Sequence, residues 1–230
     1  MRITAGTTMA AEALLFDMDG TLVDSTRVIT GLWRGWCDRH GIDAASLLRV
    51  SHGRRTIDTV RLFAPPDLDP EAEAAALTAA AATAREGLVA VPGAAGLLRT
   101  LPGSRWAVVT SADRAIARSW LGEAGLPLPE VLVAAEDVAA GKPDPAGYLQ
   151  AARRLGCPIE RAVVFEDAPA GLAAGRASGA RVVALATTLG AEALHDHDWV
   201  QNLSGVAYTP EKGGRLTFSE ANPSFSEANP

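Results

Sequence analysis

Polar side chains that could do chemistry follow short apolar runs in this sequence: Asp17 and Asp19, Thr110 and Ser111, Lys142, and the pair Glu166 and Asp167. Carboxylates can act as nucleophile, acid, base or ligand of a hard cation, and hydroxyl and ammonium groups can bind phosphoryl oxygens. These types together suit phosphoryl transfer, in which catalysis is largely positioning and charge stabilisation. The sequence therefore predicts a reaction at phosphorus.

The two carboxylates of Asp17-Met18-Asp19 have different expected roles. Asp17 is the better nucleophile because it is nearer the end of the apolar run, whereas Asp19 could protonate the leaving oxygen and then activate water. An attacking carboxylate and a phosphate repel each other, and a divalent cation held by oxygen ligands relieves that repulsion. We expect Mg²⁺ on Asp17, Asp19, Glu166 and Asp167.

Two further residues are expected to bind the transferring group. Thr110 can donate its hydroxyl to a phosphoryl oxygen, with the backbone N–H groups after it at the start of a helix, and Lys142 supplies a fixed positive charge. Ser111 is expected to contact the same substrate group.

The elements that must position these residues alternate along the chain. Apolar runs typical of buried strands occur at Ala13–Phe16, Trp106–Val109, Val131–Val133, Ala162–Phe165 and Arg181–Leu185. Segments with helical periodicity, such as Arg114–Leu121 and Ala146–Leu155, separate them. This order predicts a doubly wound, Rossmann-like α/β core whose parallel sheet is covered on both faces, with the ligand beyond the carboxyl ends of the strands.

Residues 25–91 differ in pattern, because helix formers dominate and no strong strand run appears. Thr26–His40 and the alanine-rich Pro70–Leu88 are the clearest helices. We therefore expect a helical cap at 25–91, inserted into a catalytic core of residues 1–24 and 92–212. Residues 213–230, which contain Phe-Ser-Glu-Ala-Asn-Pro twice, are expected to be a disordered or added tail.

The motif Asp17–Ser25 resembles the first motif of the haloacid dehalogenase superfamily. Thr110, Lys142 and the pair Glu166 and Asp167 resemble its later motifs in the same order, and the likeness spans about residues 14 to 185. The resemblance implies a phosphatase fold in which the helical insertion is a mobile cap, placed as in the beta-phosphoglucomutase-like branch.

Three stretches are similar to the 2-deoxyglucose-6-phosphate and glycerol phosphate phosphatases of that branch: Ser51–Thr56, Trp106–Ser111 and Gly141–Pro143. This likeness implies a phosphatase of a small sugar or polyol phosphate. It also implies that His52, Arg54 and Arg55 of the cap contact the substrate, although paired arginines on a cap are equally compatible with a solvated face.

Composition limits the partners. The 230 residues are 48% hydrophobic and 21% charged with a formal charge of -6, which gives no basic surface for nucleic acid or an anionic membrane. Only two cysteines occur, and they lack the spacing of a disulfide framework or zinc site. We expect a cytoplasmic protein that binds a small phosphorylated metabolite and acts as a monomer.

Each motif also has an ordinary structural reading. An Asp-x-Asp-Gly turn, an exposed loop lysine and an acidic helix start would explain Asp19, Lys142 and Asp167 singly. The run His195–Asp198 lacks a standard metal-ligand spacing, and Gly93–Gly96 lacks the lysine of a phosphate-binding loop. We expect both of these segments to be structural.

Three rival functions remain open. A sugar phosphomutase would use the same aspartyl phosphate but return the phosphoryl group to a sugar. A haloacid dehalogenase would also use an aspartate nucleophile, but Asp19 argues against it. A catalytically silent binding protein could share the fold, since fold does not fix function.

Overall fold

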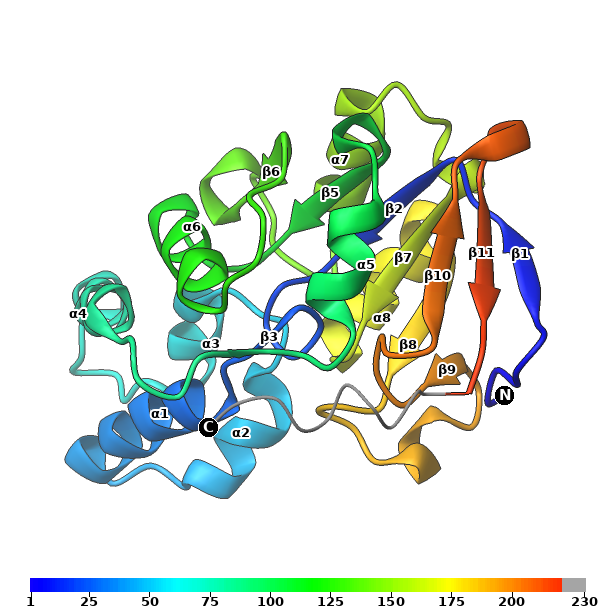
Figure 1. Cartoon of the computed structure of the whole chain (residues 1–230). Coiled ribbons are helices and arrows are strands. Elements are labelled where there is room, and N and C mark those ends of the chain that lie inside the picture. The colour runs from blue at the N-terminus through cyan, green and yellow to red at the C-terminus, as the bar shows by residue number, and fades with distance from the viewer. Residues whose placement is uncertain (221–230) are drawn as a thin grey trace.

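The computed structural model describes residues 1–220, which centre on a six-stranded sheet in the order β6-β5-β2-β7-β8-β9 (Figure 1). All of its neighbouring strands run parallel. The strands are β2 (Ala13–Phe16), β5 (Trp106–Val109), β6 (Val131–Val133), β7 (Ala162–Glu166), β8 (Arg181–Leu185) and β9 (Asp198–Val200). The predicted strands are confirmed, and β9 is a strand that the sequence analysis did not identify.

Helices cover both faces of this sheet: α5 (Ala94–Thr100), α6 (Arg114–Glu123), α7 (Ala146–Arg154) and α8 (Pro169–Ser178). Leu14 and Phe16 of β2 are buried in one core with apolar residues of α5 and α6. Ala13 and Leu15 are buried in another with residues of α7 and α8. Alternate side chains of one strand thus enter opposite cores, and the predicted doubly wound α/β fold is confirmed.

Between β3 (Val23–Asp24) and β4 (Val89–Ala90), which pair antiparallel, the chain forms helices with a small core of their own. They are α1 (Thr26–His40), α2 (Ala44–Ser51), α3 (Thr56–Phe63) and α4 (Pro70–Thr83). Helix α4 ends before the predicted Leu88 because the chain must turn back to pair β4, and Leu88 itself is buried in the core beside α5. The division into a core and a cap remains a prediction.

A second, three-stranded sheet lies beside the first, in the order β1-β11-β10 (Figure 1). Its strands are β1 (Thr8–Ala10), β10 (Val206–Thr209) and β11 (Arg215–Phe218), and all pairs are antiparallel. The sequence analysis assigned residues from 213 onward to a tail, but β11 is paired on both sides and buries Leu216 and Phe218. The rest of the repeat, residues 221–230, lies outside the described residues.

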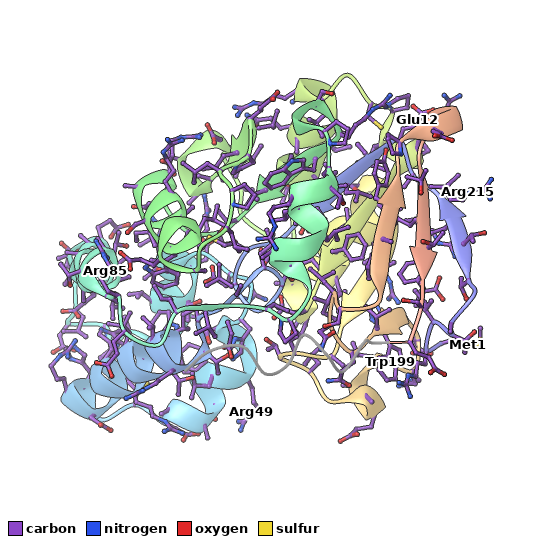
Figure 2. All side chains as sticks on the ribbon, viewed as in Figure 1. Met1, Glu12, Arg49, Arg85, Trp199 and Arg215 are labelled. Atoms are coloured by element: carbon purple, nitrogen blue, oxygen red, sulfur yellow. The ribbon has the colours of Figure 1, made fainter. Side chains whose placement is uncertain are left out.

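The N-terminus covers the outer edge of β9. Figure 2 shows Met1 and Trp199 next to each other at this edge. The Trp199 backbone N–H donates to the Met1 carbonyl at 3.1 Å, and the Arg2 guanidinium lies 5.5 Å from the centre of the Trp199 ring system. Covering an edge strand protects its unpaired backbone groups.

Short 3-10 helices complete the connections, at Gly103–Arg105, Ala135–Asp137, Ile159–Arg161, Ala191–Leu194 and Glu211–Gly213.

Leu216→Ala should destabilise the protein if β11 is part of the fold. The side chain is fully buried, so its truncation should lower the free energy of unfolding by about 3 kcal/mol, measured by urea denaturation. Arg215→Ala, at the exposed neighbouring position, is the matched control. Equal stability of the two variants would show that β11 does not contribute to the core.

Candidate active site

The predicted catalytic residues follow strands that are neighbours in the sheet. Asp17 directly follows β2, and its backbone N–H donates to the Phe165 carbonyl of β7 at 3.0 Å. Thr110 follows β5, and its N–H donates to the Val133 carbonyl of β6 at 2.9 Å. Backbone pairing therefore continues past the strand ends and fixes the positions of both side chains.

Lys142 links Asp17, the predicted nucleophile, to Glu166 at the end of β7. Its Nζ donates to Asp17 Oδ1, to Glu166 Oε1 at 2.7 Å and to the Val109 carbonyl at 3.1 Å. The ammonium is 5.3 Å from the centre of the Tyr148 ring. Lys142 is 6% exposed, and a buried ammonium requires such compensation. The exposed-loop reading of this lysine is wrong.

Glu166 is held from several sides. Its Oε1 also accepts from the Tyr148 hydroxyl at 2.8 Å, and its Oε2 accepts from the backbone N–H groups of Asp167 and Ala168 at 3.0 and 3.3 Å. A Cβ on Gly171 would lie 1.6 Å from Oε1, so the carboxylate rests on the first turn of α8. Both oxygens of Glu166 are used, which makes it an anchor for Lys142.

The Asp-x-Asp-Gly turn passes against Asp167. Gly20 has a φ of 81°, and a Cβ there would lie 2.1 Å from Asp167 Oδ2, so only glycine fits. The Thr21 hydroxyl donates to Asp167 Oδ1 at 3.0 Å. The Thr187 hydroxyl donates to the Gly20 carbonyl at 2.6 Å. The motif therefore forms the expected glycine turn, and this turn holds Asp167 in place.

Asp19 points to the start of the helical insertion. Its Oδ1 accepts from the Ser25 hydroxyl at 2.6 Å, and Ser25 is the buried residue that precedes α1. The carboxylate is therefore tied to the junction between β3 and the inserted helices.

The site carries more negative charge than its lysine balances. Burial, together with the Glu166 charge, raises the pKa of Asp17 well above its ordinary value, although Lys142 opposes this. Burial raises the pKa of Asp19 to about 6 and that of Asp167 to about 7. The raised pKa values mean that these buried carboxyl groups hold their protons more tightly, and a further cation would stabilise their ionised forms.

A divalent cation fits this arrangement. Oxygens of Asp17, Glu166 and Asp167 lie within 4.8 Å of one another. In the described part of the chain, no other set of three or more Asp, Glu, His or Cys side chains brings its ligand atoms this close together. Carboxylate oxygens are the donors that hard cations prefer. Asp19, a predicted ligand, is not in this group, because its side chain turns to Ser25.

A cavity of about 620 Å³ opens above the carboxylates. The predicted residues that line it are Asp17, Asp19, Ser111, His52, Arg54 and Arg55. Thr110 and Lys142 instead line a small void of about 20 Å³ beside it, which Ser111 and Arg55 also border. The Thr110 hydroxyl accepts from the Ala112 N–H at 3.0 Å and keeps its own hydrogen to donate.

The loop of residues 51–55 meets the core around this cavity. The Ser111 hydroxyl donates to the Gly53 carbonyl at 2.8 Å, and Gly53 lies against Ala168. The Arg55 guanidinium pairs with Asp58 at 2.7 and 3.1 Å and donates to the Ala139 carbonyl at 3.2 Å. The donors of Arg55 therefore tie this loop to the core, and its predicted contact with substrate stays a prediction.

Arg54 differs from its neighbour. Within residues 1–220 its guanidinium has no hydrogen-bond or ion-pair partner, and it is half-buried at the cavity wall. His52 lines the same wall, and burial lowers the pKa of its imidazole, which favours the neutral form at pH 7.

Sequence reasoning missed the residues that hold the predicted catalytic groups. Ser25, Thr21 and Tyr148 each bond to a predicted site carboxylate. Ser25 and Thr21 lie inside the first motif, so their position was a usable signal. Tyr148 lies in a predicted helix with helical periodicity, where nothing separates it from an ordinary core residue.

Comparison with known proteins identifies the family. The model of the haloacid dehalogenase-like hydrolases matches residues 11–179. The chain belongs to this family. Hexitol phosphatase A of Escherichia coli is 40% identical over 211 residues, covering 90% of this chain and 98% of the relative. The predicted family is therefore confirmed.

Two further proteins are also similar. Glycerol-1-phosphate phosphohydrolase 2 of Saccharomyces cerevisiae is 38% identical and covers 82% of this chain and 80% of its own. A hydrolase from Pseudomonas syringae has a similar solved structure, with a TM-score of 0.74, 25% identity and coverage of 83% of this chain and 94% of that one.

The run His195–Asp198 lies outside this site, and within it His195 and Asp196 form an exposed ion pair at 3.0 Å. Of the helices described, none has both the length and the apolar character to cross a membrane.

Asp167→Asn should stabilise the metal-free protein at high pH. The pKa of Asp167 is about 7 in the folded protein and 3.8 as its ordinary value. The folded protein therefore binds this proton more tightly than the unfolded chain, and the resulting contribution of Asp167 to the free energy of unfolding is fully present below about pH 4 and lost as pH rises through 7. At pH 8 the variant should gain on the order of 2 kcal/mol in free energy of unfolding, with little change at pH 4. Urea denaturation in EDTA measures this, and a loss of stability at pH 8 would contradict it.

Proposed function

We propose that this chain is a Mg²⁺-dependent phosphatase of small sugar or polyol phosphates and that it works through a phosphorylated Asp17. The observation that carries the proposal is the buried Lys142, which holds Asp17 in place beside the acidic cluster at the floor of a cavity. The named activities of the similar phosphatases support the same reaction.

The first half of the reaction forms a bond between Asp17 and phosphorus. A carboxylate oxygen of Asp17 attacks, the ester P–O bond breaks, and the leaving alkoxide takes its proton from Asp19. With its pKa near 6, Asp19 is partly protonated at neutral pH and can serve as this acid once it turns from Ser25.

The second half releases phosphate. Asp19, now ionised, takes a proton from water as the water oxygen attacks phosphorus and the bond to Asp17 breaks. Inorganic phosphate leaves, and both carboxylates return to their starting states. Lys142 and the Thr110 hydroxyl balance charge on the phosphoryl oxygens throughout.

Mg²⁺ would be held by Asp17 and Asp167, with Glu166 close by and engaged by Lys142. When bound, it supplies positive charge that offsets repulsion between the carboxylates and the phosphate. The position of Asp17 and Asp167 in one cluster of carboxylate oxygens supports this assignment over one that includes the Asp19 side chain, which accepts from Ser25 instead.

Residues 25–91 are proposed to act as a cap that closes the cavity and excludes water. Arg54 would then contact the substrate, since its guanidinium lines the cavity and is not engaged elsewhere within residues 1–220. Arg55 would hold the cap loop closed through the Ala139 carbonyl.

A monomer in the cytoplasm that acts on a small phosphorylated metabolite is the setting we infer. One set of inserted helices already covers the site, so a second copy is not required. Cys37 and Cys157 are both buried as free thiols, which fits a reducing compartment.

The decisive experiment for this function is phosphate release from a panel of sugar, polyol and glycolytic phosphates, with and without Mg²⁺. A parallel assay for isomerised sugar phosphate tests the mutase alternative. Metal-dependent release from a few polyol or hexose phosphates supports the proposal. Isomerised sugar phosphate without release of phosphate would favour the mutase. Binding of a phosphate ester without turnover would favour the catalytically silent binding protein.

Asp17→Asn should abolish turnover because the amide is a poor nucleophile of nearly the same volume. We expect kcat to fall at least about 1,000-fold for every substrate of the panel. Circular dichroism and thermal denaturation should show that the variant is folded, and near-normal activity would sink the proposed mechanism.

Arg54→Ala and Arg55→Ala should separate substrate binding from cap closure. Loss of the Arg54 charge should raise KM about tenfold with little change in kcat, whereas loss of Arg55 should lower kcat as well. Steady-state kinetics of both variants measures this, with Arg49→Ala on the exposed part of α2 as the control. Identical kinetic effects of the two variants would contradict the assignment.

A further inference from the structure

The cavity above the carboxylates has two chemically different parts. Its floor carries Asp17 and Asp19, and the loop of residues 51–55 adds the polar groups of His52 and Arg54. The remaining wall comes largely from α1, α4 and α6. Helix α4 packs against both α1 and α6, and Figure 1 shows all three on the side of the molecule opposite the three-stranded sheet. These three helices determine what the far part of the cavity can bind.

The wall formed by these helices is apolar. Apart from Thr26 and Thr78, the residues that the three helices contribute within the described chain are aliphatic or aromatic, among them Ile29, Leu32, Trp33, Leu77, Ile116 and Trp120. None of them is charged. The indole N–H of Trp120 is already used, because it donates to the Ala81 carbonyl at 3.3 Å.

The alanine content of α4 makes room for this part of the cavity. Ala74, Ala75 and Ala81 line it with methyl groups only, so the helix backbone stands close to the space and leaves it open. A volume of about 620 Å³ lies in the range of sites that enclose drug-sized ligands, which are larger than a phosphorylated triol.

A polyol chain lying along this wall would lose hydrogen bonds. Each hydroxyl removed from water and placed against Ile29, Leu32 or Ile116 would have no partner there, which disfavours binding. A methylene or the carbon face of a ring in the same place gains affinity by leaving water. Groups that could bind hydroxyls line the cavity outside these three helices, at His52, Arg54, Asp113, Glu136 and the floor.

We propose that the helix-lined part of the cavity, walled by α1, α4 and α6, is a subsite for hydrocarbon in the alcohol portion of the substrate. The preferred ester then carries its phosphate and nearest hydroxyls at the Asp17 end and an extended apolar stretch beyond them. This proposal rests on the proposed phosphatase function and narrows its substrate class to amphipathic phosphate esters.

A series of ethyl, butyl and hexyl phosphate tests the subsite. The kcat/KM should rise roughly two- to fourfold per added methylene. Glycerol 1-phosphate and a hexitol phosphate are included as polar substrates of similar lengths. Values that are flat or fall from ethyl to hexyl phosphate would overturn the subsite.

Thr78→Trp and Ala76→Trp form a matched pair on α4. Thr78 is half-buried and lines the cavity, whereas Ala76 is exposed and does not contribute to the lining. Filling the wall at Thr78 should lower the hexyl-to-ethyl ratio of kcat/KM at least tenfold, and Ala76→Trp should leave that ratio unchanged. An unchanged ratio in Thr78→Trp, with the variant folded by circular dichroism, would overturn the subsite.

Binding measurements test the hydrocarbon subsite separately from the phosphatase reaction. Ethylphosphonate and hexylphosphonate, which cannot be hydrolysed, are compared by calorimetry in the presence of Mg²⁺. Tighter binding of hexylphosphonate supports the subsite even if no ester is hydrolysed, an outcome that would refute only the phosphatase. Equal or weaker binding of hexylphosphonate would overturn the subsite even if polyol phosphates are hydrolysed.

Discussion

The contact of one buried ammonium with two carboxylates is the constraint on which this structure depends. Lys142 binds Asp17 and Glu166, which follow or end neighbouring strands β2 and β7. Removing all three charged groups from water costs free energy. Their mutual attraction offsets this cost only when their geometry is fixed. The fold supplies this through the Tyr148 hydroxyl and the first turn of α8, which both hold Glu166.

The same constraint explains how the helical insertion relates to the chemistry. Asp19 is tied to Ser25 at the start of α1, and Ser111 beside the site is tied to the Gly53 carbonyl. Movement of the inserted helices would therefore shift Asp19, the proposed acid, and Ser111, the residue next to Thr110. The excess of carboxylates over cations favours the binding of a divalent cation, and under the proposed subsite the apolar helix wall sets the selectivity of the cavity.

Much of the fold was predictable because apolar runs of four or five residues alternate with helical periodicity, as in β2 and β7. The strand β11 was not, because Leu216 and Phe218 alternate over only four residues beside a repeat that resembles an added tail. The grouping of Asp17, Glu166, Asp167 and Lys142 was predictable from motif order. The bonds of Arg55 to Asp58 and Ala139 were not, since sequence does not show which partners an arginine has in the fold.

In the proposed reaction, phosphorus becomes covalently bound to Asp17 during turnover. The most direct test is rapid acid quenching with a ³²P-labelled substrate, followed by peptide mapping of the protein. We predict acid-stable, hydroxylamine-labile label on the peptide that contains Asp17, with the Asp17→Asn variant unlabelled. Label on another residue, or steady turnover of substrate in the Asp17→Asn variant, would contradict the account.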